Sequence, residues 1–168
     1  RLTEAKNFGF MIHSFKALHD QHADTRLIIL GEGELRSELE ALIAQLNLTD
    51  VVDLPGFDTN PYAYFKYASL FVLSSNWEGL PGVLIQALAS KVKVVSTDCP
   101  SGPMEILDHA KFGLLVECND QVGLMQAMQQ AIFADYVHYS EADFEAHIQQ
   151  FHKATVLQQY LNMMESAL

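Results

Sequence analysis

Short runs of apolar residues alternate, along most of this chain, with segments whose apolar residues recur every three or four positions. The continuous runs predict buried strands, and the periodic segments predict amphipathic helices. Strands that are apolar throughout and separated by helices favour a parallel sheet covered on both faces. We therefore predict strands at residues 27–30, 51–54, 70–73, 92–97 and 114–116.

Helices are predicted at residues 8–18, 35–46, 60–68, 83–89, 103–108, 124–132, 141–150 and 153–166. The side chain of Asn7 or Thr3 could cap the first of them. Right-handed crossovers between the parallel strands then give a doubly wound, Rossmann-like α/β fold. The last helix carries an apolar stripe that we expect to cover another surface, made of Val156, Leu157, Tyr160, Leu161 and Met164.

Ligands of such a fold bind beyond the carboxyl ends of the strands. The turns at residues 31–33, 55–57, 77–82 and 98–102 should all lie on that edge. The most informative of them belongs to residues 74–89, where a strand passes through a turn with two glycines and a proline into a helix. Free backbone N–H groups and the positive end of a helix dipole then point at one place, which favours an anion such as phosphate. Glu78 stands at the mouth of this turn, and a carboxylate beside a phosphate site suits a sugar nucleotide.

The composition limits the classes of protein to consider. With 168 residues and 49% hydrophobic content, the chain is long enough for one well-packed domain. Its 10 basic and 21 acidic residues give a net charge of −11, which disfavours nucleic acid and anionic lipid as partners. No apolar run reaches the roughly 20 residues that a membrane span requires, and no signal peptide opens the chain. Cys99 and Cys118 have no CxxC or Cys-His spacing, so we expect reduced thiols and a cytoplasmic setting.

The beginning of the pattern looks incomplete. The first predicted helix is not preceded by a strand, although the alternation calls for one. We therefore expect residues 1–168 to be one domain of a larger protein whose first strand and further domain precede Arg1.

Five stretches of the sequence, in order and in register, carry a resemblance to a known family: residues 1–8, 30–33, 54–57, 74–89 and 94–103. Together they resemble the C-terminal half of the group 1 (family 4) glycosyltransferases. These are retaining enzymes of the GT-B type, which have two Rossmann-like domains and an active site in the cleft between them. The resemblance implies a nucleotide-sugar donor domain, with the N-terminal acceptor domain absent from this chain.

The resemblance also implies roles for single residues. Arg1 and Lys6 match the basic residues that hold the donor diphosphate, although both could instead belong to a solvated terminus. Gly31 and Gly33 would let the backbone approach the donor. Phe57 matches the place where the nucleotide base packs, with a core aromatic as the alternative.

Glu78 matches the first acid of the family's E-x7-E motif, which binds hydroxyls of the donor sugar and is the residue we assign to catalysis. A glutamate that caps the following helix is the alternative. The residues after it would contact the sugar and the leaving phosphate, partly through backbone N–H groups: Gly79, Leu80, Pro81, Gly82, Val83 and Leu84.

Two positions depart from the family pattern. Gln86 stands where the second acid of the motif would accept hydrogen bonds from the ribose, which should weaken donor binding by about 1 kcal/mol. Lys91 stands where relatives usually carry glycine, at a cost of roughly 1 kcal/mol if that residue must be left-handed.

Other chemistries are less well supported. A dinucleotide fingerprint would need a small residue at position 36, where Arg36 stands. His13, His19 and His22 lie on one predicted helix without an acid or cysteine to complete a metal set, so we expect solvated or half-buried histidines and no metal. Ser74 and Ser75 have no neighbouring histidine and no nucleophile elbow. We expect no cofactor.

The sequence therefore predicts a glycosyltransferase of the hexosyltransferase type, taking a sugar from a nucleotide diphosphate sugar, with UDP as the expected nucleotide. The acceptor would be a glycan or a lipid-linked sugar in polysaccharide or lipopolysaccharide synthesis, reached through the absent domain at the inner membrane surface. The isolated domain should be inactive. A non-catalytic nucleotide-binding module of the same family and a sugar-nucleotide epimerase of the same fold are the alternatives.

Overall fold

The structure is a computed structural model that describes residues 1–134 and 136–166. The described residues fall into two compact units, Arg1–Val137 and His138–Leu168. Each unit is described by itself below.

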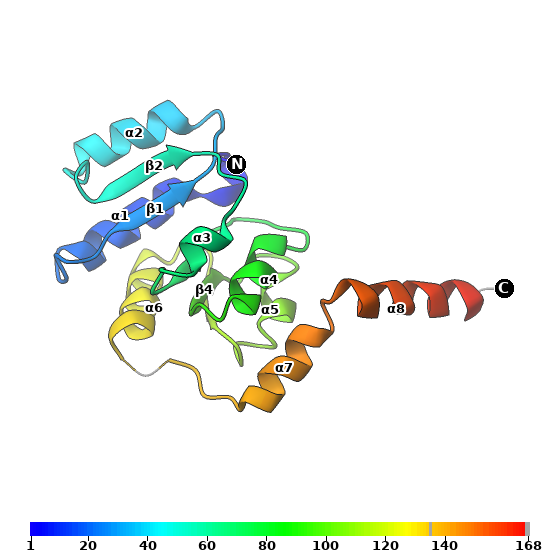
Figure 1. The fold of residues 1–168 in the computed structure, drawn as a ribbon. Coiled ribbons are helices and arrows are strands. Elements are labelled where there is room, and N and C mark those ends of the chain that lie inside the picture. Colours follow the sequence, from blue (N-terminus) through cyan, green and yellow to red (C-terminus); the bar gives the residue numbers. More distant parts are fainter. Residues whose placement is uncertain (135, 167–168) are drawn as a thin grey trace. The chain divides into compact units, whose positions relative to one another are not determined.

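The first unit contains a set of parallel strands (Figure 1). Strand β1 pairs in parallel with β2, while β4 pairs in parallel with β3 on one side and β5 on the other. All the predicted strands are present, and the prediction of a parallel α/β fold is confirmed. The strands are β1 (Leu27–Leu30), β2 (Val52–Gly56), β3 (Phe71–Leu73), β4 (Val94–Thr97) and β5 (Leu114–Val116).

The two groups of strands are not paired with each other within the described residues. Among the described residues, each group therefore has two edge strands, β1 and β2 in one and β3 and β5 in the other. The strand that we expect before Arg1 stays a prediction.

Helices connect the strands (Figure 1). Two of them, α3 and α5, are shorter than predicted. The elements are η1 (Glu4–Lys6), α1 (Phe8–His19), α2 (Arg36–Gln45), α3 (Tyr62–Phe65), α4 (Gly82–Ala89), α5 (Pro103–Ile106) and α6 (Gln121–Phe133).

The capping role predicted for Asn7 or Thr3 is wrong. Asn7 precedes α1 in a left-handed conformation, and neither side chain makes a capping hydrogen bond. The Asn7 amide donates instead to the side-chain oxygens of Asn76 and Asn119, at 2.9 and 3.0 Å. It thereby ties the start of α1 to the loops that follow β3 and β5.

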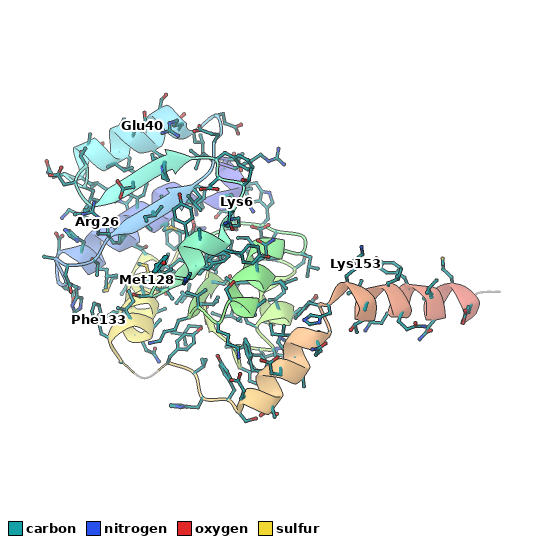
Figure 2. The ribbon with its side chains drawn as sticks, viewed as in Figure 1. Lys6, Arg26, Glu40, Met128, Phe133 and Lys153 are labelled. Carbon is teal, nitrogen blue, oxygen red and sulfur yellow. The ribbon has the colours of Figure 1, made fainter. Side chains whose placement is uncertain are left out.

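Two apolar clusters form the core of this unit. One gathers residues of α1, α2, β1 and β2, including Phe15 and Ile29. The other gathers residues of α1, β4 and α6, including Val95 and Met128. Figure 2 labels Met128. Val72 of β3 packs against both clusters, so the two groups of strands share one continuous interior. Burial of this interior is the main force that holds the strand ends, and the turns after them, in place.

The second unit consists of α7 (Glu141–Gln149) and α8 (Lys153–Ser166). The Ser140 hydroxyl accepts the Asp143 N–H at 3.1 Å and caps α7. The stripe predicted on α8 is exposed rather than covered in the described residues, with Tyr160 63% and Met164 59% exposed.

Lys91 is left-handed, as the sequence comparison with the family suggested, with φ at 58°. Its N–H donates to Leu88 O at 2.7 Å and the Val92 N–H donates to Ala87 O at 3.4 Å, which is a Schellman ending for α4. Lys91→Gly should therefore raise the free energy of unfolding by about 1 kcal/mol, because glycine adopts this conformation without a Cβ clash. Urea unfolding followed by circular dichroism measures the change.

Asn47→Gly provides the matched control for this prediction. Asn47 ends α2 in the same way, with φ at 57°, and asparagine already tolerates the left-handed region. Its substitution should change stability by no more than a few tenths of a kcal/mol. Equal effects of the two substitutions would show that lysine is not strained at position 91.

Candidate functional site

The four turns predicted to share one edge do meet there in two pairs. The Gly31 N–H donates to Gly56 O at 2.8 Å, joining the turns after β1 and β2. A Cβ on Gly102 would lie 2.5 Å from Pro81 Cδ and 2.6 Å from Gly79 O, so the turns after β3 and β4 are in direct contact. The predicted common edge is confirmed.

The first residues of the chain bridge these two pairs. The Leu2 N–H donates to Glu32 O at 2.9 Å, beyond the end of β1. The Asn76 N–H donates to Ala5 O at 2.9 Å, beyond the end of β3. The segment therefore passes directly in front of the sheet edge and brings Lys6 to it.

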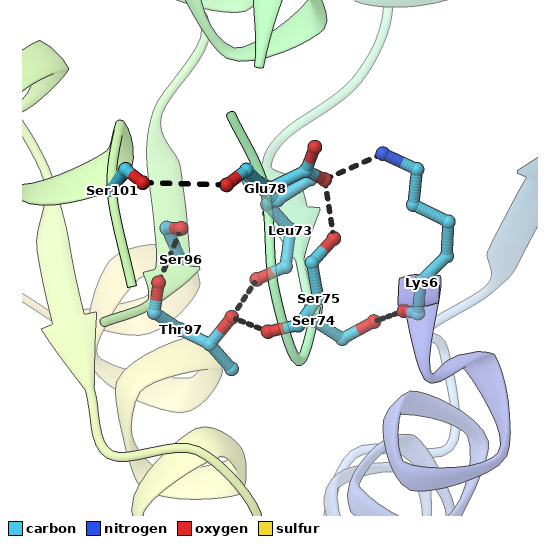
Figure 3. A network of polar contacts seen from close by, with 8 residues as sticks. All are labelled: Lys6, Leu73, Ser74, Ser75, Glu78, Ser96, Thr97 and Ser101. Carbon is cyan, nitrogen blue, oxygen red and sulfur yellow. Dashed lines mark hydrogen bonds and ion pairs between the residues drawn. The ribbon is translucent and has the colours of Figure 1, made fainter. Parts of the chain in front are cut away.

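Glu78 and Lys6 meet at this edge, 72 residues apart in the sequence (Figure 3). Lys6 Nζ lies 2.5 Å from Glu78 Oε1, and the Ser75 hydroxyl donates to the same oxygen at 2.6 Å. The Glu78 side chain is 10% exposed and that of Lys6 28%. Within the described residues, Glu78 Oε2 has no hydrogen-bond partner. Both alternative interpretations are wrong, because Glu78 does not cap α4 and Lys6 is not a solvated end.

Hydroxyl groups at and just beyond the ends of β3 and β4 fix the backbone around this pair (Figure 3). The Ser74 hydroxyl donates to Lys6 O at 2.8 Å, and Thr97 Oγ1 donates to Ser75 O at 2.7 Å. The Ser101 hydroxyl reaches Glu78 O at 3.5 Å. Ser74, Ser75 and Thr97 are all buried.

Sequence reasoning missed these hydroxyl residues, since Ser74 and Ser75 were considered only as nucleophiles. One signal was available. Hydroxyl residues follow or end two apolar strands at positions that a parallel sheet brings to the same edge. Such side chains can satisfy backbone carbonyls where the strand hydrogen bonding stops.

The turn before α4 presents free backbone amides. In the described part of the chain, the N–H groups of Gly79, Leu80, Gly82 and Val83 have no acceptor. A Cβ at Gly79 or Gly82 would meet no atom within 4 Å, so this side of the turn is open. The first turn of a helix with unpaired N–H groups and an open approach is suited to an anion.

Two of the predicted binding residues, Pro81 and Leu84, contribute no unpaired N–H group to this turn. Pro81 has no N–H and is buried before α4. Leu84 is fully buried, and its N–H donates to Pro81 O at 2.9 Å. Both shape the turn through packing.

The other predicted binding residues surround the site at different exposures. Arg1 is exposed, and its backbone lies against Gly31, which has φ at 131°. The backbone of Leu2 fills the space in front of Gly33. Phe57 is 75% exposed, so the alternative of a core aromatic is wrong. Gln86 is half-buried on α4, and its side-chain amide makes no hydrogen bond to another described residue. Their donor contacts stay predictions.

The cysteines and histidines do not form a reactive centre in the described residues. Burial, with smaller effects of Cys118 and Glu78, raises the pKa of the Cys99 thiol, and burial followed by Asp98 raises that of Cys118. Both thiols are free, and because their pKa values are raised they stay protonated and are poor nucleophiles at neutral pH. His22 lies beyond the end of α1, contrary to the prediction of one helix, and stacks on Phe133. No described group of His, Cys, Asp or Glu is placed to hold a metal ion.

Two of the grooves among the described residues, of about 590 and 310 Å³, are not lined by Glu78. No described helix combines the length and apolar character that crossing a bilayer requires.

Comparison with known proteins places these features in a family. The family described as "Glycosyl transferases group 1" matches residues 1–141. An uncharacterised glycosyltransferase of Methanocaldococcus jannaschii is 49% identical over 107 residues, which are 64% of this chain and 26% of that protein. The Campylobacter jejuni enzyme N-acetylgalactosamine-N,N'-diacetylbacillosaminyl-diphospho-undecaprenol 4-alpha-N-acetylgalactosaminyltransferase is 41% identical over 135 residues, 80% of this chain and 36% of that enzyme. The chain thus spans well under half the length of these two relatives.

Solved structures share the fold. A structure of TarM from S. aureus, which contains UDP, matches with a TM-score of 0.87 at 24% identity, over 96% of this chain and 33% of that one. A structure of HepE from Anabaena, in complex with UDP and glucose, matches with a TM-score of 0.81 at 21% identity, over 99% of this chain and 46% of that one. At these identities the likeness establishes the architecture.

Proposed function

The chain belongs to the group 1 glycosyltransferases of the GT-B type, and from this premise we propose that it is the donor-binding domain of a sugar transferase. The donor is a UDP-sugar, and the acceptor is a glycan or a lipid-linked sugar. The observation that carries the proposal is the meeting of Lys6 and Glu78 beside the open amides that precede α4.

Each part of this arrangement suits one part of a UDP-sugar. Lys6 and Arg1 supply positive charge for the diphosphate, which the chain's net charge of −11 would otherwise repel. The amides of Gly82 and Val83 face the leaving phosphate with the positive end of the α4 dipole. The Glu78 carboxylate accepts hydrogen bonds from sugar hydroxyls, and exposed Phe57 offers a flat apolar face to the base.

The reaction is the exchange of one C–O bond for another. The bond from the anomeric carbon to the diphosphate oxygen breaks, and a bond from that carbon to the acceptor oxygen forms on the same face of the sugar. The acceptor proton passes to the departing diphosphate, whose growing negative charge the amide groups stabilise. Glu78 holds the sugar in the orientation that this exchange requires.

The names of relatives support the substrate classes. The Campylobacter jejuni relative is named for transfer of N-acetylgalactosamine to a sugar on diphospho-undecaprenol. Relatives in Escherichia coli and Salmonella typhimurium are named as putative colanic acid biosynthesis glycosyltransferases. We therefore propose a role in polysaccharide or lipopolysaccharide synthesis, at the cytoplasmic face of the membrane that carries the acceptor.

Gln86 favours one alternative, a nucleotide-binding module without transferase activity. Its amide replaces a charged acceptor for the ribose with a neutral one, which weakens donor binding without removing the hydrogen bond. Such a module would bind UDP yet transfer no sugar when joined to an acceptor domain.

The proposal is tested by titrating the ¹⁵N-labelled chain with UDP and with GDP while following amide shifts. We expect UDP to shift resonances near Lys6, Phe57 and residues 79–86, and GDP to shift them at higher concentration. An absence of UDP-dependent shifts in these segments would overturn the proposed site. Sugar transfer by the protein with both domains then separates the transferase from the inactive module.

A further inference from the structure

The two donors on Glu78 Oε1 differ in how firmly they are held. Ser75 is completely buried, its own carbonyl accepts from Thr97 Oγ1 at 2.7 Å, and its hydroxyl lies 2.6 Å from Oε1. Lys6 reaches the same oxygen from a partly exposed side chain with a flexible four-carbon stem. The backbone that carries the Ser75 hydroxyl is therefore anchored to β4, whereas the Lys6 ammonium group sits on a flexible stem that can move toward another anion.

Donor binding would break the Lys6 contact and keep the Ser75 contact. In the proposed function, on which this inference rests, Lys6 turns to the diphosphate, a stronger site of negative charge than one carboxylate. Glu78 then loses its ammonium partner, and within the described residues Ser75 is the side chain that still bonds Oε1. Glu78 Oε2 has no partner among the described residues and is the oxygen left to accept a hydrogen bond from the donor.

We infer that Ser75 is the positioning residue of this site: it holds Glu78 Oε1 and so directs Oε2 to a hydroxyl of the donor sugar. The sugar hydroxyl donates to Oε2, and the Ser75 hydroxyl donates to Oε1. Ser75 itself does not touch the donor. Removing the Ser75 hydroxyl should therefore weaken binding of the UDP-sugar and leave binding of UDP unchanged.

Calorimetric titration of the chain with UDP and with four UDP-sugars tests the inference, using the glucose, galactose, N-acetylglucosamine and N-acetylgalactosamine forms. The most tightly bound UDP-sugar is the reference ligand. We expect Ser75→Ala to weaken that ligand about tenfold, the usual effect of losing a hydrogen bond to a charged group, and to leave UDP affinity within about twofold. Ser75→Thr, which keeps the hydroxyl, should restore the preference for the sugar form.

Ser96→Ala is the matched control. Ser96 is as fully buried as Ser75 and its hydroxyl donates to Thr97 O at 2.9 Å, without touching Glu78 (Figure 3). Ser96→Ala should change the affinities for UDP and for the reference UDP-sugar equally or not at all. If Ser75→Ala fails to fold, Ser75→Cys preserves the shape with a much weaker donor and should show the same selective loss.

The outcomes separate this inference from the proposed function. A wild-type chain that binds neither UDP nor any UDP-sugar overturns the proposed function and this inference with it. A wild-type chain that prefers a UDP-sugar, together with a Ser75→Ala chain that keeps the same preference, overturns the inference alone. Equal weakening of UDP and UDP-sugar by Ser75→Ala also overturns it, because that pattern indicates a general loss of structure.

Discussion

Glu78→Gln is expected to lower the rate of sugar transfer by about two orders of magnitude. The substitution keeps the shape of the side chain but removes the charge, and a hydrogen bond to a charged group contributes about 1.5–3 kcal/mol. Since the contact is made to the sugar, UDP affinity should not fall. It should instead stay level or rise, because Lys6 no longer shares its charge with the carboxylate. Initial rates of transfer by the two-domain protein, and calorimetry with UDP, measure the two effects.

Glu4→Gln is the control for this substitution. Glu4 is an exposed acid of the same N-terminal segment, and only its backbone carbonyl contacts the site loop, through Asn76 Nδ2 at 3.3 Å. Its loss removes the same charge without touching the sugar site, so transfer should remain within about twofold. If the Glu78→Gln enzyme kept most of its transfer rate, the proposed role of Glu78 in the reaction would be wrong.

Gly102→Ala is expected to lower the free energy of unfolding by about 1–3 kcal/mol. Two independent costs act at this position. The backbone has φ at 88°, which side chains rarely adopt, and a Cβ would lie 2.5 Å from Pro81 Cδ and 2.6 Å from Gly79 O. The turn before α4 would have to move, so UDP affinity should also fall. Urea unfolding and calorimetry measure the two changes.

Gly82→Ala separates strain from site geometry. A Cβ at Gly82 meets no atom within 4 Å, so stability should be unchanged, while the added methyl group stands where the phosphate is proposed to approach. We therefore expect weaker UDP binding without loss of stability. Gly102→Ala with wild-type stability would mean that the turn adapts without cost.

Much of the fold followed from the sequence because burial leaves a local pattern. The continuous apolar run located β1, although its Ile28 is 50% exposed and one face of the strand is therefore not fully covered, and the repeat of apolar residues every three to four positions located α1. The lengths of the short helices α3 and α5 were overestimated, since a few residues carry too little periodicity to show where a helix ends. The exposed stripe of α8 shows the limit of the same argument, because a pattern indicates that a face is apolar and not what covers it.

The site was predictable to the extent that it depends on chain order. The turn at residues 77–82 and its carboxylate could be located because parallel strands place such turns at one edge. The left-handed conformation of Lys91 could be anticipated only from the family resemblance, and the structure confirms that conformation. The exposure of Phe57 and the need for glycine at position 102 depend on neighbours that are distant in sequence.

The order and type of the elements, the parallel arrangement and the edge at which ligands would bind all follow from local periodicity and strand connection. Which groups act together at that edge became visible in the folded chain. Lys6 and Ser75 both donate to one carboxylate oxygen of Glu78, because the chain's first segment crosses the end of β3. Contacts of this kind depend on side-chain positions to within an ångström, and no spacing along the chain encodes them.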